Sequence, residues 1–257
     1  MLKIETLNEY ISYFKVPYKD IFVGIYVLRH PNGAILFDTA ATPEDVDGYI
    51  VPALEQLGVF PADLTHIFIS HNHKDHAGGL PRLAELYPNT KIVSGCQLLK
   101  EQYPDILMPQ DGQMLTDSLQ VITIPGHSED SAALLDLRTN TLVSGDCLQG
   151  YGIYGSGTWY GAIRLPEAHY AAIDKLRKLP IEVVAAAHDY HPCGMLSFGR
   201  QAVAERLDSC IDALERVRNL INANPELDDE QIAALSNDGT LPTIAVRVVT
   251  ALRNMQD

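Results

Sequence analysis

Three histidines and an aspartate lie within six residues, directly after a hydrophobic run. The run from His66 to Ser70 is rich in β-branched and aromatic residues, which predicts a buried strand. Residues i and i+2 of an extended chain share a face, so His71 and His73 can converge on one metal ion. The turn that follows directs Asp75 and His76 differently. This pattern predicts a metal centre with room for two adjacent ions.

The alternative is that these four are unrelated polar residues in a loop. For single histidines elsewhere in the chain, a non-functional role is the better interpretation. An isolated histidine in an apolar segment is more often a core residue than a ligand. We interpret His66 and His169 as structural in that sense and His191 as a surface residue. Four potential ligands in six residues are too dense for coincidence, so the cluster keeps its functional interpretation.

The cluster resembles the signature of the metallo-β-lactamase superfamily of metal-dependent hydrolases, in which three further ligands follow in a fixed order. The chain matches those three motifs with Pro-Gly-His127-Ser, Ser-Gly-Asp146-Cys and Ala-His188-Asp-Tyr. The likeness spans about residues 20 to 191. One departure is Ala187, because a glycine commonly precedes the final histidine of the family.

The resemblance implies a dinuclear centre. It assigns one metal ion to His71, His73 and His127 and a second to Asp75, His76 and His188, with Asp146 bridging the two. It also places Asp38 and Ser128 behind the ligands. Imidazoles and carboxylates suit two divalent ions, zinc first and manganese or iron as alternatives, and no cysteine lies in the hexad.

The implied chemistry is hydrolysis by a hydroxide held between the two ions. Divalent ions about 3.5–4 Å apart can share a water and lower its pKa toward neutrality. The resemblance gives Asp75 the task of orienting this water and passing its proton, and Asp146 the task of holding both ions. Both aspartates are therefore candidate catalytic residues as well as candidate ligands.

Hydrophobic periodicity predicts an α+β protein with a four-layer αββα sandwich and extra C-terminal helices, and the resemblance implies that the sandwich is of the metallo-β-lactamase type. The predicted strands cover residues 21–29, 34–38, 66–70, 91–94, 119–124, 132–137, 141–144 and 181–187. The predicted helices cover residues 42–58, 79–87, 95–103, 166–179, 197–222, 227–235 and 241–255. We predict a catalytic domain over residues 1–195 and a helical extension packed on it over residues 196–257.

A glycine-rich segment with four large aromatic residues follows Asp146 and spans residues 149–164. One interpretation is a pocket wall in which Tyr151, Tyr154, Trp159 and Tyr160 bind the substrate. The alternative is a loop whose aromatic side chains cover the edge of the core. The position directly after a candidate ligand favours the pocket.

Composition restricts the class of substrate and the location. The formal charge of −14 and the dispersed 19 basic residues argue against nucleic acid as a partner and favour a small molecule. No apolar stretch approaches a membrane span and no export signal is visible, so we expect no membrane association and a cytoplasmic location. The four cysteines are then expected to be free thiols. The C-terminal helices could cap the site or form a homodimer contact.

The function predicted from the sequence is hydrolysis of a small-molecule ester, thioester or lactone, in an enzyme similar to glyoxalase II and to lactonases. A mononuclear iron persulfide dioxygenase is the main alternative, and a phosphodiesterase or nuclease is disfavoured by charge. Flavin-linked redox members replace the second hexad histidine with glutamate, which His73 contradicts. A non-catalytic domain that uses metal only for stability is disfavoured by the complete ligand set.

Overall fold

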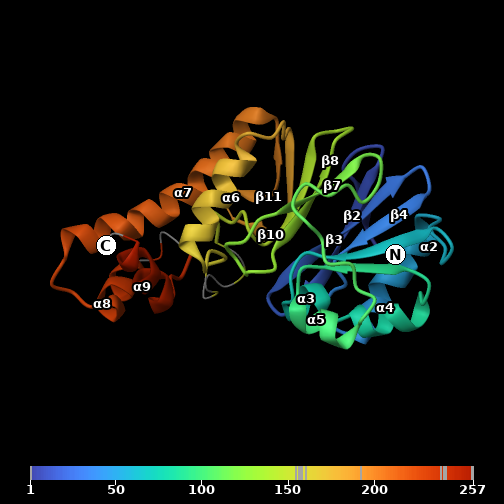
Figure 1. Cartoon of the computed structure of the whole chain (residues 1–257), viewed down its shortest axis with the longest axis horizontal. Helices are drawn as coiled ribbons and strands as arrows, with labels where there is room; N and C mark the ends of the chain where they lie inside the picture. The colour runs from blue at the N-terminus through green and yellow to red at the C-terminus, as the bar shows by residue number, and fades with distance from the viewer. Residues whose placement is uncertain are drawn as a thin grey trace. The chain divides into compact units, whose positions relative to one another are not determined.

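The computed structural model describes residues 2–153, 155, 159, 161–191, 193–237, 239 and 242–255. The chain forms two compact units, which are described separately below. The first unit contains Met1–Ile122 and Ala132–Thr139, and the second contains Thr123–Ser131 and Asn140–Asp257. Each unit holds a mixed sheet and several helices (Figure 1), which confirms the predicted α+β class. The predicted domain boundary after residue 195 stays a prediction.

The first unit is built on a mixed six-stranded sheet. Its strands are β1 (Ile4–Thr6), β2 (Ile11–Tyr18), β3 (Ile21–His30), β4 (Gly33–Phe37), β5 (Leu64–Ile69) and β6 (Lys91–Ser94). Strands β1 to β4 pair antiparallel, whereas β5 pairs parallel with both β4 and β6. Two further strands, β7 (Leu119–Thr123) and β8 (Ala132–Asp136), are neighbours in the strand order.

The central strands of this sheet are held by stacked aromatic rings. Phe37 on β4 stacks on Phe68 on β5 with ring centroids 5.2 Å apart, and its edge meets Tyr26 on β3. All three side chains are fully buried. Aromatic pairs in these geometries stabilise beyond their buried area. The end of β5, where the candidate ligands begin, is therefore anchored to a rigid core.

Short helices lie between the parallel strands β4, β5 and β6 and after β6. They are α1 (Pro43–Asp45), α2 (Val51–Gln56), α3 (Lys74–Ala77), α4 (Leu80–Leu86) and α5 (Gln97–Gln102). The predicted helix over 42–58 starts as expected, because the Thr42 hydroxyl accepts from the Asp45 amide. A π-helical turn, η1 (Val46–Ile50), interrupts it just before Pro52. Pro52 has no amide hydrogen to donate to the preceding turn, and it is tolerated because it lies in the first turn of α2.

The second unit has a smaller mixed sheet and the longest helices. Strand β10 (Val183–Tyr190) pairs parallel with β9 (Thr141–Gly145) and antiparallel with β11 (Gly194–Phe198). The helices are α6 (Pro166–Leu176), α7 (Arg200–Ala223), α8 (Asp229–Ser236) and α9 (Val246–Asn254). Figure 1 shows α8 and α9 beside the C-terminal part of α7. A buried cluster that includes Val217, Ile232 and Val249 joins these three helices.

Three strands escaped the sequence prediction. Strands β1 and β2 precede the first predicted strand, and β2 pairs with β3 through a tight turn at Lys19 and Asp20. This turn contains no glycine or asparagine, although Lys19 adopts the left-handed conformation that those residues favour. Strand β11 occupies the start of a segment predicted to be helical. Gly199, with φ of 83°, separates β11 from α7.

Within the described residues, no helix has both the length and the apolar character needed to cross a membrane.

Gly33 at the β3–β4 turn provides a test of this arrangement. It has φ of 138°, and a Cβ atom there would lie 2.1 Å from the Asp63 carbonyl oxygen. We expect Gly33→Ala to lower the free energy of unfolding by about 1–3 kcal/mol, as overpacking and a positive φ combine. Urea denaturation measures the change. Gly48→Ala is the matched control, because a Cβ atom at that position would meet nothing within 4 Å; equal stability of both variants would contradict the assigned turn.

Candidate metal centre

The first donor set, His71, His73, Asp75 and His76, follows the C-terminal end of β5 in the first unit. His71 Nδ1 lies 3.0 Å from the Ser70 hydroxyl, and its Nε2 faces His73 Nδ1 at 2.8 Å. The His71 side chain is buried and the His73 side chain is partly exposed. The His71 ring is thus held by Ser70 on one side, and its other nitrogen is directed at His73.

His76 and Asp75 lie on the short helix α3, which the sequence did not predict. His76 Nδ1 lies 2.7 Å from Asp38 Oδ2, whereas its Nε2 is 3.5 Å from Asp75 Oδ2. Both Asp38 and His76 are completely buried. The carboxylate of Asp38 thus fixes the ring from behind, and the other ring nitrogen points to Asp75. The predicted role of Asp38 behind a metal ligand stays a prediction, and its contact with His76 is compatible with that role.

The Asp38 carboxylate also accepts hydrogen bonds from Ser70. Its Oδ1 accepts from the Ser70 amide at 2.8 Å and its Oδ2 accepts from the Ser70 hydroxyl at 2.9 Å. Burial raises the pKa of Asp38, against the effect of His76 and of the hydrogen bonds from Ser70. Its backbone has φ of 68°, a costly conformation for a non-glycine residue. The strain orients one carboxylate toward both Ser70 and His76.

The loop after Asp38 packs tightly on α3. Thr39 donates to the His76 carbonyl from both its amide and its hydroxyl, each at 2.7 Å. A Cβ at Gly78 would lie 2.2 Å from the Ala41 carbonyl oxygen, and one at Gly79 would lie 2.1 Å from that of Thr39. Only glycine permits this close approach of backbones. The glycine pair at the end of the hexad therefore lets α3 rest on the Asp38 loop.

The second donor set, His127, Asp146 and His188, belongs to the second unit. Asp146 follows β9, and its two oxygens face different rings. Oδ2 lies 3.4 Å from His127 Nε2, and Oδ1 lies 3.2 Å from His188 Nε2. All three side chains are buried, with 2–6% of their surface exposed. Such close packing of two imidazoles on one carboxylate has the geometry of a shared ligand.

Residues of the same unit hold the His127 ring and the Asp146 backbone. His127 Nδ1 lies 2.6 Å from the Ala162 carbonyl oxygen, so the ring presents Nε2 to Asp146. The Tyr190 hydroxyl donates to the Asp146 carbonyl at 3.4 Å. Strand β10 continues through His188 to Tyr190 despite the alanine at position 187. Ala187, which stands where the family commonly has glycine, therefore leaves the strand conformation around His188 unchanged.

These donor sets fit divalent metal ions on chemical grounds. His71, His76 and His127 each have Nδ1 held by an oxygen and Nε2 directed at another donor, the arrangement typical of metal-bound imidazole. The neighbouring cysteine is not a competing ligand. Burial raises the pKa of Cys147 to about 12, and its thiol donates to the Ile124 carbonyl. Nitrogen and carboxylate ligands without thiolate suit zinc, manganese or iron.

Two contributions to these sites were not recognised in the sequence. Tyr18 ends the unpredicted strand β2, and burial together with the charge of Asp75 raises the pKa of its hydroxyl. Ala162 contributes only a backbone carbonyl, which carries no side-chain signal. Tyr18 could have been found from the alternating pattern of β2; Ala162 could not.

The remaining predicted site residues have varied surroundings. Ser128 is partly buried, and its hydroxyl lies 2.7 Å from that of Ser131. Tyr151 packs against the helical cluster of α7 to α9, as a core cover would. Trp159 is partly buried. Tyr154 and Tyr160 lie outside the described residues, so the substrate-binding role of this segment stays a prediction.

The three histidines interpreted as non-ligands, His66, His169 and His191, have different surroundings. His169 is buried on α6, where it packs against Gly126, and burial lowers its pKa to about 4. His191 is exposed and pairs with Ile153 through its backbone. His66 is buried at the start of β5. A neutral, packed His169 agrees with the structural role predicted for it.

The chain matches one protein-family model and is similar in sequence to several known proteins. The family model described as the metallo-beta-lactamase superfamily matches residues 19–95. The chain is 31% identical to "Uncharacterized protein YobT" of Bacillus subtilis (strain 168), over 53% of this chain and 68% of that protein. It is 32% identical to a hydroxyacylglutathione hydrolase of Synechococcus sp. (strain JA-2-3B'a(2-13)), over 65% of this chain and 63% of that protein.

A third relative and a solved structure extend the comparison. An atrochrysone carboxyl ACP thioesterase of Emericella nidulans is 29% identical over 47% of this chain and 42% of its own length. The matches thus span 42–68% of the length of these curated relatives. A metallo-beta-lactamase family protein from Thermus thermophilus superposes with a TM-score of 0.68 at 18% identity, covering 98% of this chain and 95% of that chain. This likeness confirms the predicted fold.

Asp38 offers a test of how the first donor set is held. An asparagine at this position has one acceptor oxygen instead of two and cannot satisfy both Ser70 and the His76 ring. We expect Asp38→Asn to weaken binding of Zn²⁺ by about 10–100-fold. Competition with a chromophoric chelator measures the affinity. Asp105→Asn, an equal change of charge at an exposed position, should leave it unchanged; equal affinities would show that Asp38 does not orient a ligand.

Proposed function

Because the chain belongs to the metallo-beta-lactamase superfamily, we propose that it is a metal-dependent hydrolase that cleaves a thioester of a small molecule. Esters and lactones belong to the same reaction class and are the nearest alternatives. The observation that carries the proposal is the pair of contacts at Asp146, whose two oxygens face His127 and His188. A carboxylate that faces two separate imidazoles in this way is suited to join two ions.

The donor sets divide between two ions as the sequence motifs suggest. We assign one ion to His71, His73 and His127 and the other to Asp75, His76 and His188, with Asp146 shared. The opposite orientation of the two oxygens of Asp146 supports that sharing. The directed ring nitrogens of His71 and His76 support the ligand role of the first donor set. We propose zinc as the occupant, with manganese or iron as alternatives.

Each residue of the sites then has a defined task. Two divalent ions, when bound, lower the pKa of a water and polarise the substrate carbonyl. Asp75 accepts the proton of the attacking water and passes it to the leaving group. Asp38 keeps the His76 ring in the tautomer with its proton on Nδ1, because a carboxylate can only accept. Ser70 and Ala162 hold the rings of His71 and His127 in the same way.

The choice of a thioester rests on the relatives. One is named a hydroxyacylglutathione hydrolase and another an ACP thioesterase. Since the matches span only part of those proteins, their substrates are not transferred to this chain as such. The formal charge of −14 favours a small acyl substrate over a nucleic acid, because phosphate contacts need clustered basic residues.

The proposal is tested with the intact protein purified without chelator. We expect close to two metal ions per chain by elemental analysis, and hydrolysis of a thioester in a panel that also contains a lactone, a phosphodiester and a persulfide. Asp146→Ala should remove the shared ligand and lower kcat by orders of magnitude, with circular dichroism unchanged because the fold is held by the core. Asp105→Ala is the control at an exposed aspartate.

Other outcomes of this experiment would contradict specific parts of the proposal. One iron per chain after metal supplementation, together with oxidation of the persulfide, would replace the hydrolase by the dioxygenase. Unchanged turnover in folded Asp146→Ala would show that this residue is not a ligand. Cleavage of the phosphodiester alone would overturn the choice of substrate class.

Trp159 tests the predicted substrate pocket. If its ring contacts the acyl group, Trp159→Ala should raise KM or lower kcat/KM with the metal content unchanged, because an aromatic face contributes binding and not ligation. Trp159→Phe should restore much of the loss, since it keeps an aromatic face. Steady-state kinetics with the substrate found above measures both variants. If only thermal stability falls, the segment covers the core and does not bind substrate.

A further inference from the structure

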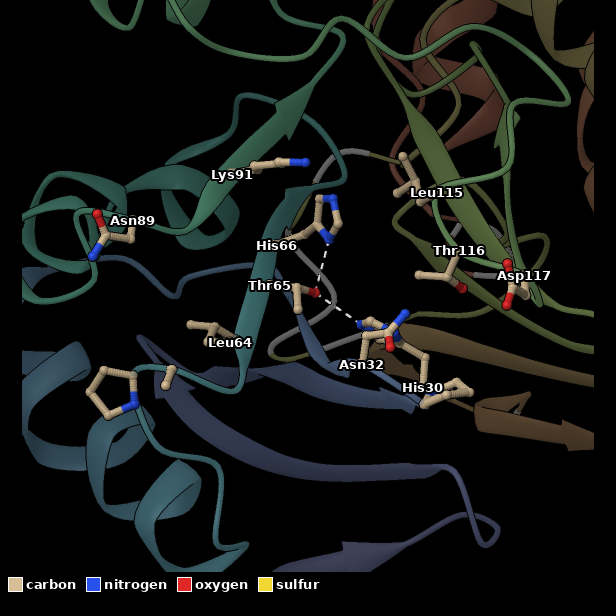
Figure 2. A pocket seen from close by; sticks show the side chains of 13 residues that line it. His30, Asn32, Leu64, Thr65, His66, Asn89, Lys91, Leu115, Thr116 and Asp117 are labelled. Atoms are coloured by element: carbon tan, nitrogen blue, oxygen red, sulfur yellow. Dashed lines mark hydrogen bonds between the residues drawn. The ribbon is translucent and has the colours of Figure 1, made fainter.

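A cavity of about 730 Å³ lies in the first unit, formed entirely by residues of that unit. Figure 2 shows it around the end of β3, the starts of β5 and β6, and the segment that precedes β7. His66 near the start of β5 lines it, whereas His71 follows the opposite end of that strand. Five residues of extended chain separate these two histidines by roughly 16 Å. The cavity is therefore a site distinct from the first donor set.

Thr65 organises the polar floor of this cavity. Its hydroxyl donates to the Ala34 carbonyl at 3.0 Å. His30 Nε2 and His66 Nδ1 each lie 2.9 Å from the same oxygen, as the dashed lines in Figure 2 show. Because its only proton is already donated, Thr65 accepts from both rings through its two lone pairs. The protons of His66 and His30 are therefore on Nδ1 and Nε2 respectively.

This assignment leaves His66 Nε2 as a hydrogen-bond acceptor. Burial, together with the charges of Lys91 and His30, lowers the pKa of His66 to about 4. Burial also lowers the pKa of His30, with Arg138 acting in the same direction and Asp117 in the opposite one. Both rings are thus neutral near pH 7. A ligand that meets His66 Nε2 must bring a proton of its own.

Lys91 supplies a positive charge next to that acceptor. His66 and Lys91 are register partners on the parallel strands β5 and β6, so their side chains share a face of the sheet. In Figure 2 the Lys91 side chain extends toward the His66 ring. Within the described residues, the Lys91 ammonium makes no hydrogen bond and no ion pair. An unpaired ammonium beside an acceptor favours an anion that also carries a hydroxyl proton.

A phosphate monoester has this combination at a pH close to 6. Its second pKa is about 6, so oxygen atoms with negative charge and a P–OH proton coexist in one group. A carboxylate or a sulfate ester has no proton to offer at that pH. The lining of the cavity also includes Asp117, Asn32 and Asn89, which suit the hydroxyl groups of a small polyol and not a second anion.

We propose that this cavity binds a small phosphate monoester, with Lys91 donating to the phosphate oxygens and His66 Nε2 accepting the phosphate proton. The phosphate group enters beside the register pair of β5 and β6, and its organic part extends toward Asp117. The lining of the cavity is partly apolar and includes Pro31, Pro61 and Leu115. This binding is independent of the hydrolytic reaction proposed above.

Calorimetric titration of the intact protein at pH 6.5 tests the proposal with glycerol 3-phosphate, inorganic phosphate and sulfate. We expect saturable binding of the two phosphates at one site per chain, at least tenfold tighter than sulfate, which has the same shape and no proton. Lys91→Gln should weaken phosphate binding at least tenfold. Lys178→Gln, which removes an exposed lysine of the second unit, is the matched control and should have no effect.

A second variant separates the proton-accepting role from the charge. His66→Asn keeps a polar atom near Thr65 and removes Nε2, so phosphate should lose its advantage over sulfate while circular dichroism is unchanged. Equal binding of phosphate and sulfate by the wild type would overturn the proposal. So would unchanged phosphate affinity in Lys91→Gln, because the phosphate would then bind elsewhere, the metal ions included. Hydrolysis measured without phosphate should be the same in Lys91→Gln and wild type.

Discussion

The candidate centre depends on a hydrogen-bond partner for the Nδ1 proton of each buried imidazole. A ring that is buried must find a partner for its Nδ1 proton, because an unsatisfied polar group costs free energy in the interior. His76 uses Asp38, and His127 uses the carbonyl of Ala162. Once Nδ1 is held, the ring cannot rotate and Nε2 has one direction. The strained backbone of Asp38 and the glycines that end the hexad both serve this single requirement.

The sequence predicted the parts of this centre that are encoded locally. His71, His73 and His76 lie together within a single stretch of six residues, and β5 before them is a clear hydrophobic run. Asp38 was also recognisable, but only through the family resemblance. Its contact with His76 joins residues 38 positions apart, and no periodicity reports such a distance. Helix α3 was not predicted because four residues are too few to show a helical pattern.

The secondary structure was predicted wrongly where the local preferences of the residues conflict with the pairing of strands. Strand β2 alternates between buried and exposed positions, yet it contains Pro17 and ends in a turn without glycine or asparagine. Pairing with β3 overrides both signals. The first two residues of the predicted helix over 197–222, Ser197 and Phe198, instead pair with β10 as the end of strand β11. In each case, hydrogen bonds with the neighbouring strand decide the structure, and the local preferences of the residues do not report that pairing.

Strand β5 shows how surroundings decide what a histidine does. At its N-terminal end, His66 is held by the neutral hydroxyl of Thr65 and lies near Lys91, and its pKa falls to about 4. Beyond its C-terminal end, His76 is held by the carboxylate of Asp38, which makes an imidazole a better electron donor to a metal. The two rings have the same intrinsic chemistry and comparable burial. The Nδ1 partner differs between the two rings. His66, held by a hydroxyl, is suited to accept a proton from a bound small molecule, whereas His76, held by a carboxylate, is suited to bind a metal ion.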